Sequence, residues 1–119
     1  MKILIVDDST TMRRIIKNQL EAMGVKDTME AANGEEALAV LSKNMPVDIV
    51  MLDWNMPVMD GITFLKRVRS EGTYKNVKII MCTSESEKSR VVEALKEGAN
   101  NYIVKPFTPE SVKEKLGLS

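Results

Sequence analysis

Histidine is absent from the 119-residue sequence, and cysteine occurs once. The lack of histidine excludes an imidazole general base and a histidine metal site, which leaves carboxylate oxygens as the available metal ligands. The single thiol, Cys82, cannot form an internal disulfide. We therefore interpret Cys82 as an inert core residue and expect the chain to reside in the reducing cytoplasm.

Long hydrophobic runs and an excess of one charge are missing as well. No apolar stretch approaches the ~20 residues of a membrane-spanning helix, so membrane insertion is not expected. The apolar start, residues 3–6, is too short for a signal peptide and is followed by acids. The 17 basic and 17 acidic residues give a formal net charge of +0, which argues against a general nucleic-acid binder. With 44% hydrophobic and 29% charged residues, the composition fits one globular domain, residues 1–119.

Strand-like and helix-like segments alternate along the chain. Short apolar runs predict strands, and apolar residues at helical spacing between them predict helices. The expected strands are residues 2–7, 28–32, 49–52, 77–83 and 101–104. Helices are expected after the capping residues Ser9, Asn33, Asp60 and Thr108 and around residues 91–95, with ends near Gly24, Gly72 and Gly98. This alternation predicts an α/β fold, a doubly wound five-stranded parallel sheet in the order 2-1-3-4-5 with helices on both faces, as in flavodoxin-like proteins.

Acidic residues follow two strands that would lie side by side. The first strand ends in Asp7 and Asp8, and the third ends in Asp53. In a sheet of this order the ligand site lies beyond the carboxyl ends of the strands, where the order reverses, here between strands one and three. Neighbouring carboxylates repel one another unless a cation lies among them, and a few oxygen ligands with several waters suit Mg²⁺ better than Ca²⁺.

A hydroxyl and an ammonium group are expected at the same edge, because Thr83 ends the fourth strand and Lys105 follows the fifth. Both residue types stabilise a phosphoryl group. With Mg²⁺ and Lys105 neutralising charge, Asp53 would act as a nucleophile and form an acyl phosphate. Each residue alone is more often a cap, a turn residue or a surface lysine, but their convergence on one edge favours a site.

Four segments of the chain match a known family. They are VDDS at residues 6–9, LDWNMPVMDG at 52–61, TS at 83–84 and KPF at 105–107. Together they resemble the receiver domain of two-component response regulators, and the resemblance covers the whole chain. Trp54-Asn55 after the acid, Glu85 after the threonine and Tyr102 before the lysine are similar to the stand-alone chemotaxis regulators, the CheY-like subgroup.

The resemblance implies that Asp53 is the phosphoacceptor and receives its group from a phosphohistidine on a histidine kinase of the CheA type. It further implies that Mg²⁺ is ligated by Asp8, by Asp53 and by the backbone carbonyl of Asn55. Asp7 would bind this ion through water. The activity implied is that of a signalling switch and not of an enzyme, since only phosphotransfer to the chain itself and its own dephosphorylation are catalysed.

The remaining roles implied by the resemblance concern the response to phosphorylation. Lys105 would pair with a phosphoryl oxygen, and the hydroxyl of Thr83 would bond to the group. Movement of Thr83 would let Tyr102 turn inward and change the surface that partners bind. Asn55 and Glu85 stand where the family adjusts the lifetime of the acyl phosphate.

The partners implied are a histidine kinase, a flagellar motor switch protein of the FliM type or another output protein, and a phosphatase, with the chain acting as a monomer. The alternative is a single-domain phosphorelay carrier that passes the phosphoryl group to a His-phosphotransfer protein. A Mg²⁺-dependent phosphatase with an aspartate nucleophile is disfavoured, because Asn55 stands where those enzymes have a second acid. A flavin carrier would need phosphate loops rich in Ser, Thr and Gly.

The chain departs from the family pattern at two places. Ser84 replaces the usual small alanine, so its hydroxyl is expected to alter phosphoryl access or hydrolysis. The last helix, which begins at Pro109, is short and would reduce the partner-binding face. Two questions stay open, namely whether the Lys105–Pro106 bond is cis, and whether Met56 and Met59 fill the core or form a contact surface.

Overall fold

A five-stranded parallel sheet in the order β2-β1-β3-β4-β5 forms the centre of the molecule, as predicted. The computed structural model describes residues 1–117, and for residues 85 and 86 the backbone alone. The strands are β1 (Lys2–Val6), β2 (Asp27–Ala31), β3 (Ile49–Asp53), β4 (Lys78–Thr83) and β5 (Asn101–Val104). The helices are α1 (Thr10–Ala22), α2 (Gly34–Asn44), α3 (Gly61–Arg69), α4 (Val91–Lys96) and α5 (Pro109–Leu116), with 3₁₀ turns η1 (Gly72–Tyr74) and η2 (Glu85–Arg90).

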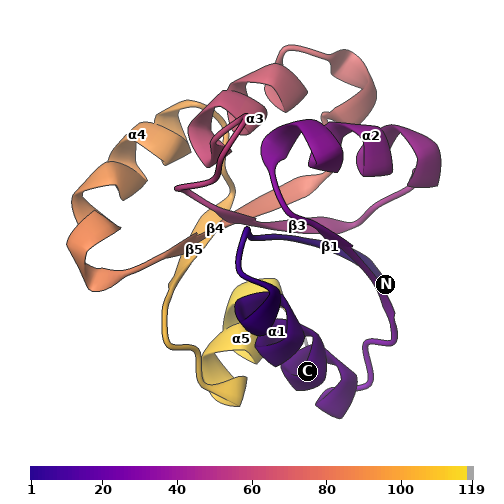
Figure 1. Ribbon diagram of the computed structural model, residues 1–119, viewed down its shortest axis with the longest axis vertical. Coiled ribbons are helices and arrows are strands. Elements are labelled where there is room, and N and C mark those ends of the chain that lie inside the picture. Colours follow the sequence, from indigo (N-terminus) through magenta and orange to yellow (C-terminus); the bar gives the residue numbers. More distant parts are fainter. Residues whose placement is uncertain (118–119) are drawn as a thin grey trace.

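Helices cover both faces of the sheet (Figure 1). Successive side chains of a strand point to opposite faces, so Leu4 and Val50 contact the layer of α2, α3 and α4. Ile3 and Met51 contact the layer of α1 and α5 on the other side. Both faces of β1 and β3 are therefore buried, which is why these strands are continuous apolar runs and not alternating ones.

The predicted caps form at the starts of four helices. In each case the side chain of the capping residue accepts a hydrogen bond from the backbone N–H three residues later, with the pairs Ser9–Met12, Asn33–Glu36, Asp60–Thr63 and Thr108–Ser111. Gly24 and Gly98 lie just beyond α1 and α4 with φ of 90° and 109°, a left-handed backbone that suits glycine. These caps determine where the chain turns after β1, β2, β3 and β5, and so they position four loops at the carboxyl edge.

One predicted helix is shorter than the apolar spacing indicates. The third helix ends at Arg69 and not near Gly72, because the Arg69 guanidinium donates to the backbone carbonyls of Tyr74, Val77 and Gly98 and ties the following turn to its end. After β4 the chain first forms the 3₁₀ turn η2 and becomes α-helical only over α4. Three serines in residues 84–89 favour capped turns over a regular helix.

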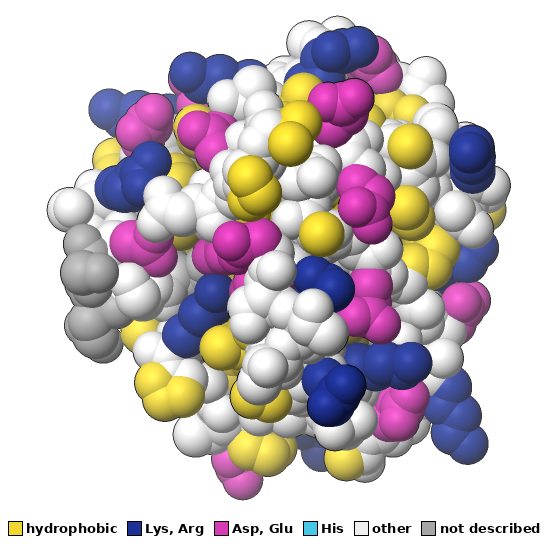
Figure 2. Space-filling model, viewed as in Figure 1, with side chains coloured by type: hydrophobic (Ala, Val, Ile, Leu, Met, Phe, Trp, Pro, Cys, Tyr) yellow, Lys and Arg dark blue, Asp and Glu magenta, His cyan; other side chains and the backbone are white. Residues whose placement is uncertain are grey.

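The face of the molecule drawn in Figure 2 shows no separation of charge. Basic and acidic side chains are interspersed over this face, in keeping with the formal net charge of +0. Among residues 1–117, no helix has the length and apolar character needed to cross a bilayer.

Candidate functional site

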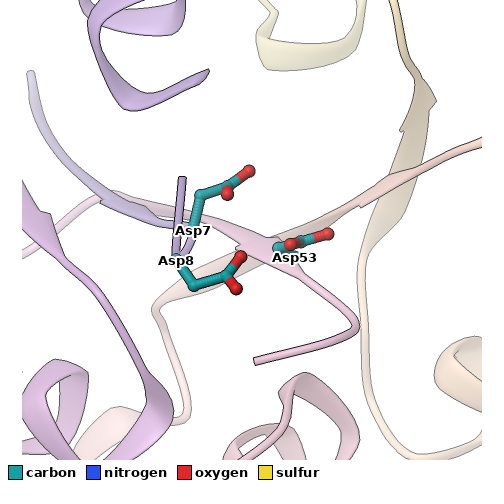
Figure 3. Close-up of side chains that lie close together, drawn as sticks. All are labelled: Asp7, Asp8 and Asp53. Atoms are coloured by element: carbon teal, nitrogen blue, oxygen red, sulfur yellow. The ribbon is translucent and has the colours of Figure 1, made fainter. Parts of the chain in front are cut away.

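Three carboxylates meet at the carboxyl edge of the sheet. Asp7 and Asp8 follow β1, and Asp53 is the last residue of β3, which pairs directly with β1. One carboxylate oxygen from each lies within 4.8 Å of the others, and the three side chains lie close together in Figure 3. Asp7 and Asp53 are 2% and 8% exposed, whereas Asp8 is open to solvent. The acids that the sequence places at two separate strand ends therefore form one cluster.

Lys105 connects two of these acids. Its Nζ donates to Asp7 Oδ2 and to Asp53 Oδ1, each at 3.1 Å. The backbone N–H of Lys105 donates to the carbonyl of Thr83 at 2.7 Å, which holds the start of the loop after β5 against the end of β4. The Lys105–Pro106 peptide bond is cis, which answers the question that the sequence leaves open.

Burial and charge act in opposite directions on the ionisable groups of the site. Burial raises the pKa of Asp53 above its ordinary value of 3.8, the charge of Lys105 opposes this rise, and the charge of Asp7 adds to it. Burial lowers the pKa of Lys105, but the attraction of Asp53 and Asp7 outweighs it, so the pKa of Lys105 lies above its ordinary 10.5. Lys105 is therefore a cation at neutral pH, and the acid cluster still favours additional positive charge.

The cluster has the donor chemistry of a small, hard cation site. It offers carboxylate oxygens only, since the nearby Cys82 is fully buried and burial raises the pKa of its thiol to about 12. Oxygens bound to one Mg²⁺ at about 2.1 Å lie at most about 4.2 Å apart, so small rotations of the three side chains would bring them into range. The exposure of Asp8 leaves room for the waters that Mg²⁺ retains.

Thr83 lies at the same edge, but its hydroxyl is engaged elsewhere. The side chain is fully buried, and Oγ1 donates to the backbone carbonyl of Ser84 at 3.1 Å. Tyr102, on the edge strand β5, is partly exposed, and the Lys115 ammonium lies 4.6 Å from its ring centroid. Of the proposed switch pair, Thr83 is thus at the site and Tyr102 is on the neighbouring surface. The side chain of Glu85 lies outside the part of the chain that the structure describes.

The loop after β3 is held by backbone hydrogen bonds. Gly61 N–H donates to the carbonyl of Trp54 at 2.9 Å, and Gly34 N–H donates to the carbonyl of Met59 at 3.0 Å. Met56 and Met59 pack against the buried core, which favours the interpretation as core fillers. Val58, between them, has a left-handed φ of 68° and is 76% exposed. The backbone immediately after Asp53 is therefore firmly positioned.

Sequence reasoning missed two residues that contact the site. Arg13 donates from Nη1 to the backbone carbonyl of Asp7 at 2.6 Å and so supports the first acid. The Glu87 carboxylate bonds to the side chain of Asn55 and to Ser84. The pattern Ser-x-x-Glu at residues 84–87, a capping-box signature, was the available signal for Glu87.

A parallel sheet with clustered acids and a bridging lysine at its switch point is the arrangement of receiver domains. The model of the response regulator receiver domain family matches residues 3–117, and the chain belongs to this family of two-component signalling proteins. It is 55% identical to a chemotaxis protein CheY homologue of Campylobacter jejuni over 98% of this chain and 89% of that protein. It is 53% identical to the chemotaxis protein CheY1 of Helicobacter pylori over 98% and 94%. The solved structure of Vibrio cholerae CheY4 superimposes with a TM-score of 0.85 at 39% identity, covering 95% of this chain and 92% of that one.

Proposed function

We propose that the protein is a chemotaxis response regulator that accepts a phosphoryl group on Asp53. The observation that carries this proposal is the joining of Asp7 and Asp53 by Lys105 at the carboxyl edge of the sheet. A nucleophilic carboxylate beside a fixed ammonium is what phosphoryl transfer requires, because catalysis of this reaction consists mostly of positioning and charge stabilisation.

In the proposed reaction an Asp53 carboxylate oxygen attacks phosphorus on the phosphohistidine of a kinase. The new O–P bond forms as the P–N bond breaks, and the imidazole leaves and takes up a proton. Lys105 is positioned to pair with the phosphoryl oxygens. Mg²⁺, held by Asp8, Asp53 and the carbonyl of Asn55 and through water by Asp7, would supply further neutralising charge.

The proposed output is the binding of a partner in the cytoplasm. The relatives named CheY suggest a flagellar motor switch protein of the FliM type as that partner. A hollow lined in part by Tyr102, Ser111 and Lys115 lies beside the site, and Lys105 borders it. A movement of Lys105 or Thr83 would therefore alter this surface. In this role the protein is a switch and not an enzyme with a separate substrate.

Acetyl phosphate tests the phosphoacceptor role directly. With Mg²⁺ present, the intact protein should gain the mass of one phosphoryl group, and the adduct should be stable in acid and labile in base. The Asp53→Asn variant should gain none, because the amide is not a nucleophile for phosphorus. An unchanged mass of the wild-type protein, together with failure to bind beryllofluoride, would rule out the proposal. A pull-down with beryllofluoride-loaded protein would show whether a motor protein or a His-phosphotransfer domain binds.

Replacing Tyr102 with alanine should leave phosphorylation of Asp53 intact and weaken binding of the motor switch protein about tenfold, as truncation of an interface tyrosine commonly does. Titration of the beryllofluoride-loaded and free forms with the partner measures the effect. Lys43→Ala on α2, exposed and away from β5, is the matched control and should bind like the wild type. Equal partner affinity of wild type and Tyr102→Ala in the loaded state would remove Tyr102 from the switch.

A further inference from the structure

The Glu87 carboxylate joins two loops at the mouth of the acidic site. Its Oε2 accepts a hydrogen bond from Asn55 Nδ2 at 2.5 Å, and its Oε1 accepts from the backbone N–H of Ser84 at 3.1 Å and from the Ser84 hydroxyl at 3.0 Å. Glu87 belongs to η2 and is partly buried. We call these three hydrogen bonds the Glu87 bridge. It connects the loop after β3 with the loop after β4.

The bridge lies close to the proposed reacting group. Asn55 follows Asp53 by two residues, and Ser84 directly follows Thr83. Asp53 is paired with Cys82 in the register of β3 and β4, so both loops leave the sheet side by side. The Asn55 amide and the Ser84 N–H and hydroxyl, which we call the rim donors, therefore lie on the two loops that leave the sheet beside Asp53.

A phosphoryl group on Asp53 would compete with Glu87 for these donors. It brings close to two negative charges and three strong acceptor oxygens into the pocket. The Asn55 and Ser84 donors on the two loops beside it now bond to a carboxylate, which is itself an anion. Neighbouring anions repel one another, and a donor that serves one is not available to the other. Phosphorylation and the intact Glu87 bridge therefore disfavour each other.

We propose that Glu87 is a positioning residue for phosphoryl acceptance. In the unphosphorylated protein its carboxylate occupies the rim donors of Asn55 and Ser84, and these hydrogen bonds must break when Asp53 is phosphorylated. The proposal rests on the phosphoacceptor role of Asp53. It gives a function to the hydroxyl of Ser84, the residue at which the chain departs from the family pattern, because that hydroxyl supplies one of the three hydrogen bonds. The Glu87 bridge also provides a path by which phosphorylation of Asp53 would alter η2.

Release of Glu87 has a natural reporter in Trp54. The indole is 1% exposed, and the guanidinium of Arg90 lies 4.6 Å from its ring centroid. Arg90 is the last residue of η2, the turn that carries Glu87. If η2 moves when the bridge opens, the cation above Trp54 moves with it. Indole fluorescence is sensitive to a nearby charge, so Trp54 gives a second readout beside the rate of phosphotransfer.

The test compares Glu87→Gln and Glu87→Ala with the wild type and with Glu93→Gln, an exposed α4 glutamate that serves as the charge-matched control. Gln keeps an acceptor for the Ser84 donors and removes the charge, whereas Ala removes both. With acetyl phosphate and Mg²⁺, both Glu87 variants should form the Asp53 adduct about tenfold faster, the effect expected for one repelling charge at a partly solvated rim. Glu93→Gln should match the wild type.

The second measurement is the fluorescence of Trp54 on addition of beryllofluoride. In the wild type the signal should change as the bridge opens, and in Glu87→Ala the change should be smaller because η2 is already released. If Glu87 is only a helix cap, Glu87→Gln will react at the wild-type rate, and that result would overturn the proposal. If the wild type is phosphorylated but both Glu87 variants react at the wild-type rate, the proposed role of Glu87 is wrong and the proposed function stands. Wild-type protein that takes no phosphoryl group would overturn the proposed function together with it.

Discussion

Replacing Lys105 with methionine is expected to lower the free energy of unfolding by about 3 kcal/mol at neutral pH without divalent cations, the cost of breaking a largely buried ion pair from one side. The ammonium is 3.1 Å from carboxylate oxygens of both Asp7 and Asp53. Without it, two buried acids face each other and the nearby Asp8 with no ammonium to offset their repulsion. Urea denaturation followed by circular dichroism measures the loss.

The loss should depend on pH in a defined way. Because the folded-state pKa of Lys105 is raised above 10.5, its stabilising charge is fully present below pH 10.5 and disappears as the pH rises through the folded value. At the acid end, the pKa of Asp53 is raised above 3.8, so this partner takes up a proton at a higher pH than an ordinary aspartate. The difference between wild type and Lys105→Met should therefore be largest near neutral pH and shrink toward both extremes.

Lys43→Met, at an exposed lysine of α2, is the control and should change stability by no more than about 0.5 kcal/mol. Mg²⁺ should stabilise Lys105→Met more than the wild type, because the carboxylates freed from the ammonium would be available to the ion. Equal stability of Lys105→Met and wild type at neutral pH would show that the acid cluster does not depend on the lysine.

Replacing Gly61 with alanine is expected to cost about 3 kcal/mol, the upper range for added atoms in a packed interior. A Cβ at Gly61 would lie far inside van der Waals contact of the Asp53 carbonyl oxygen, 3.0 Å from its carbonyl carbon and 3.2 Å from the Trp54 Cα. These are backbone atoms of the strand end that carries the proposed phosphoacceptor, so they cannot move aside as a flexible side chain would. Thermal unfolding measures the cost, and slower phosphorylation should accompany it.

Gly72→Ala is the matched control for Gly61→Ala. A Cβ at Gly72 would meet no other atom within 4 Å, so this variant should be as stable as the wild type or gain up to about 1 kcal/mol through the less flexible unfolded chain. Similar stability losses in both variants would mean that the close approach of residue 61 to β3 does not decide the geometry of the site.

The fold and the acid cluster were predictable because both follow from local sequence. Alternating apolar runs determine which segments become strands, and parallel strands bring their carboxyl ends to one edge. Asp7 and Asp53 therefore had to lie together once the sheet order was known. The caps at residues such as Ser9 and Asp60 were equally visible, since a cap is read over four consecutive residues.

The features that were missed depend on contacts between side chains and distant backbone. The early end of α3 comes from Arg69, whose guanidinium reaches the carbonyl of Gly98 in another loop. The Glu87 bridge depends on how the 3₁₀ turn η2 orients one glutamate toward Asn55. The left-handed φ of Val58 is unexpected for a β-branched residue. Periodicity does not encode such contacts, because they involve single residues and the placement of whole loops.

The pairing of Asp7 with Lys105 joins residues 98 positions apart. A growing chain that has emerged only as far as β4 already contains all three carboxylates but lacks the ammonium that offsets their repulsion. The acid cluster therefore gains the ammonium only after β5 has joined the sheet, because Lys105 directly follows that strand.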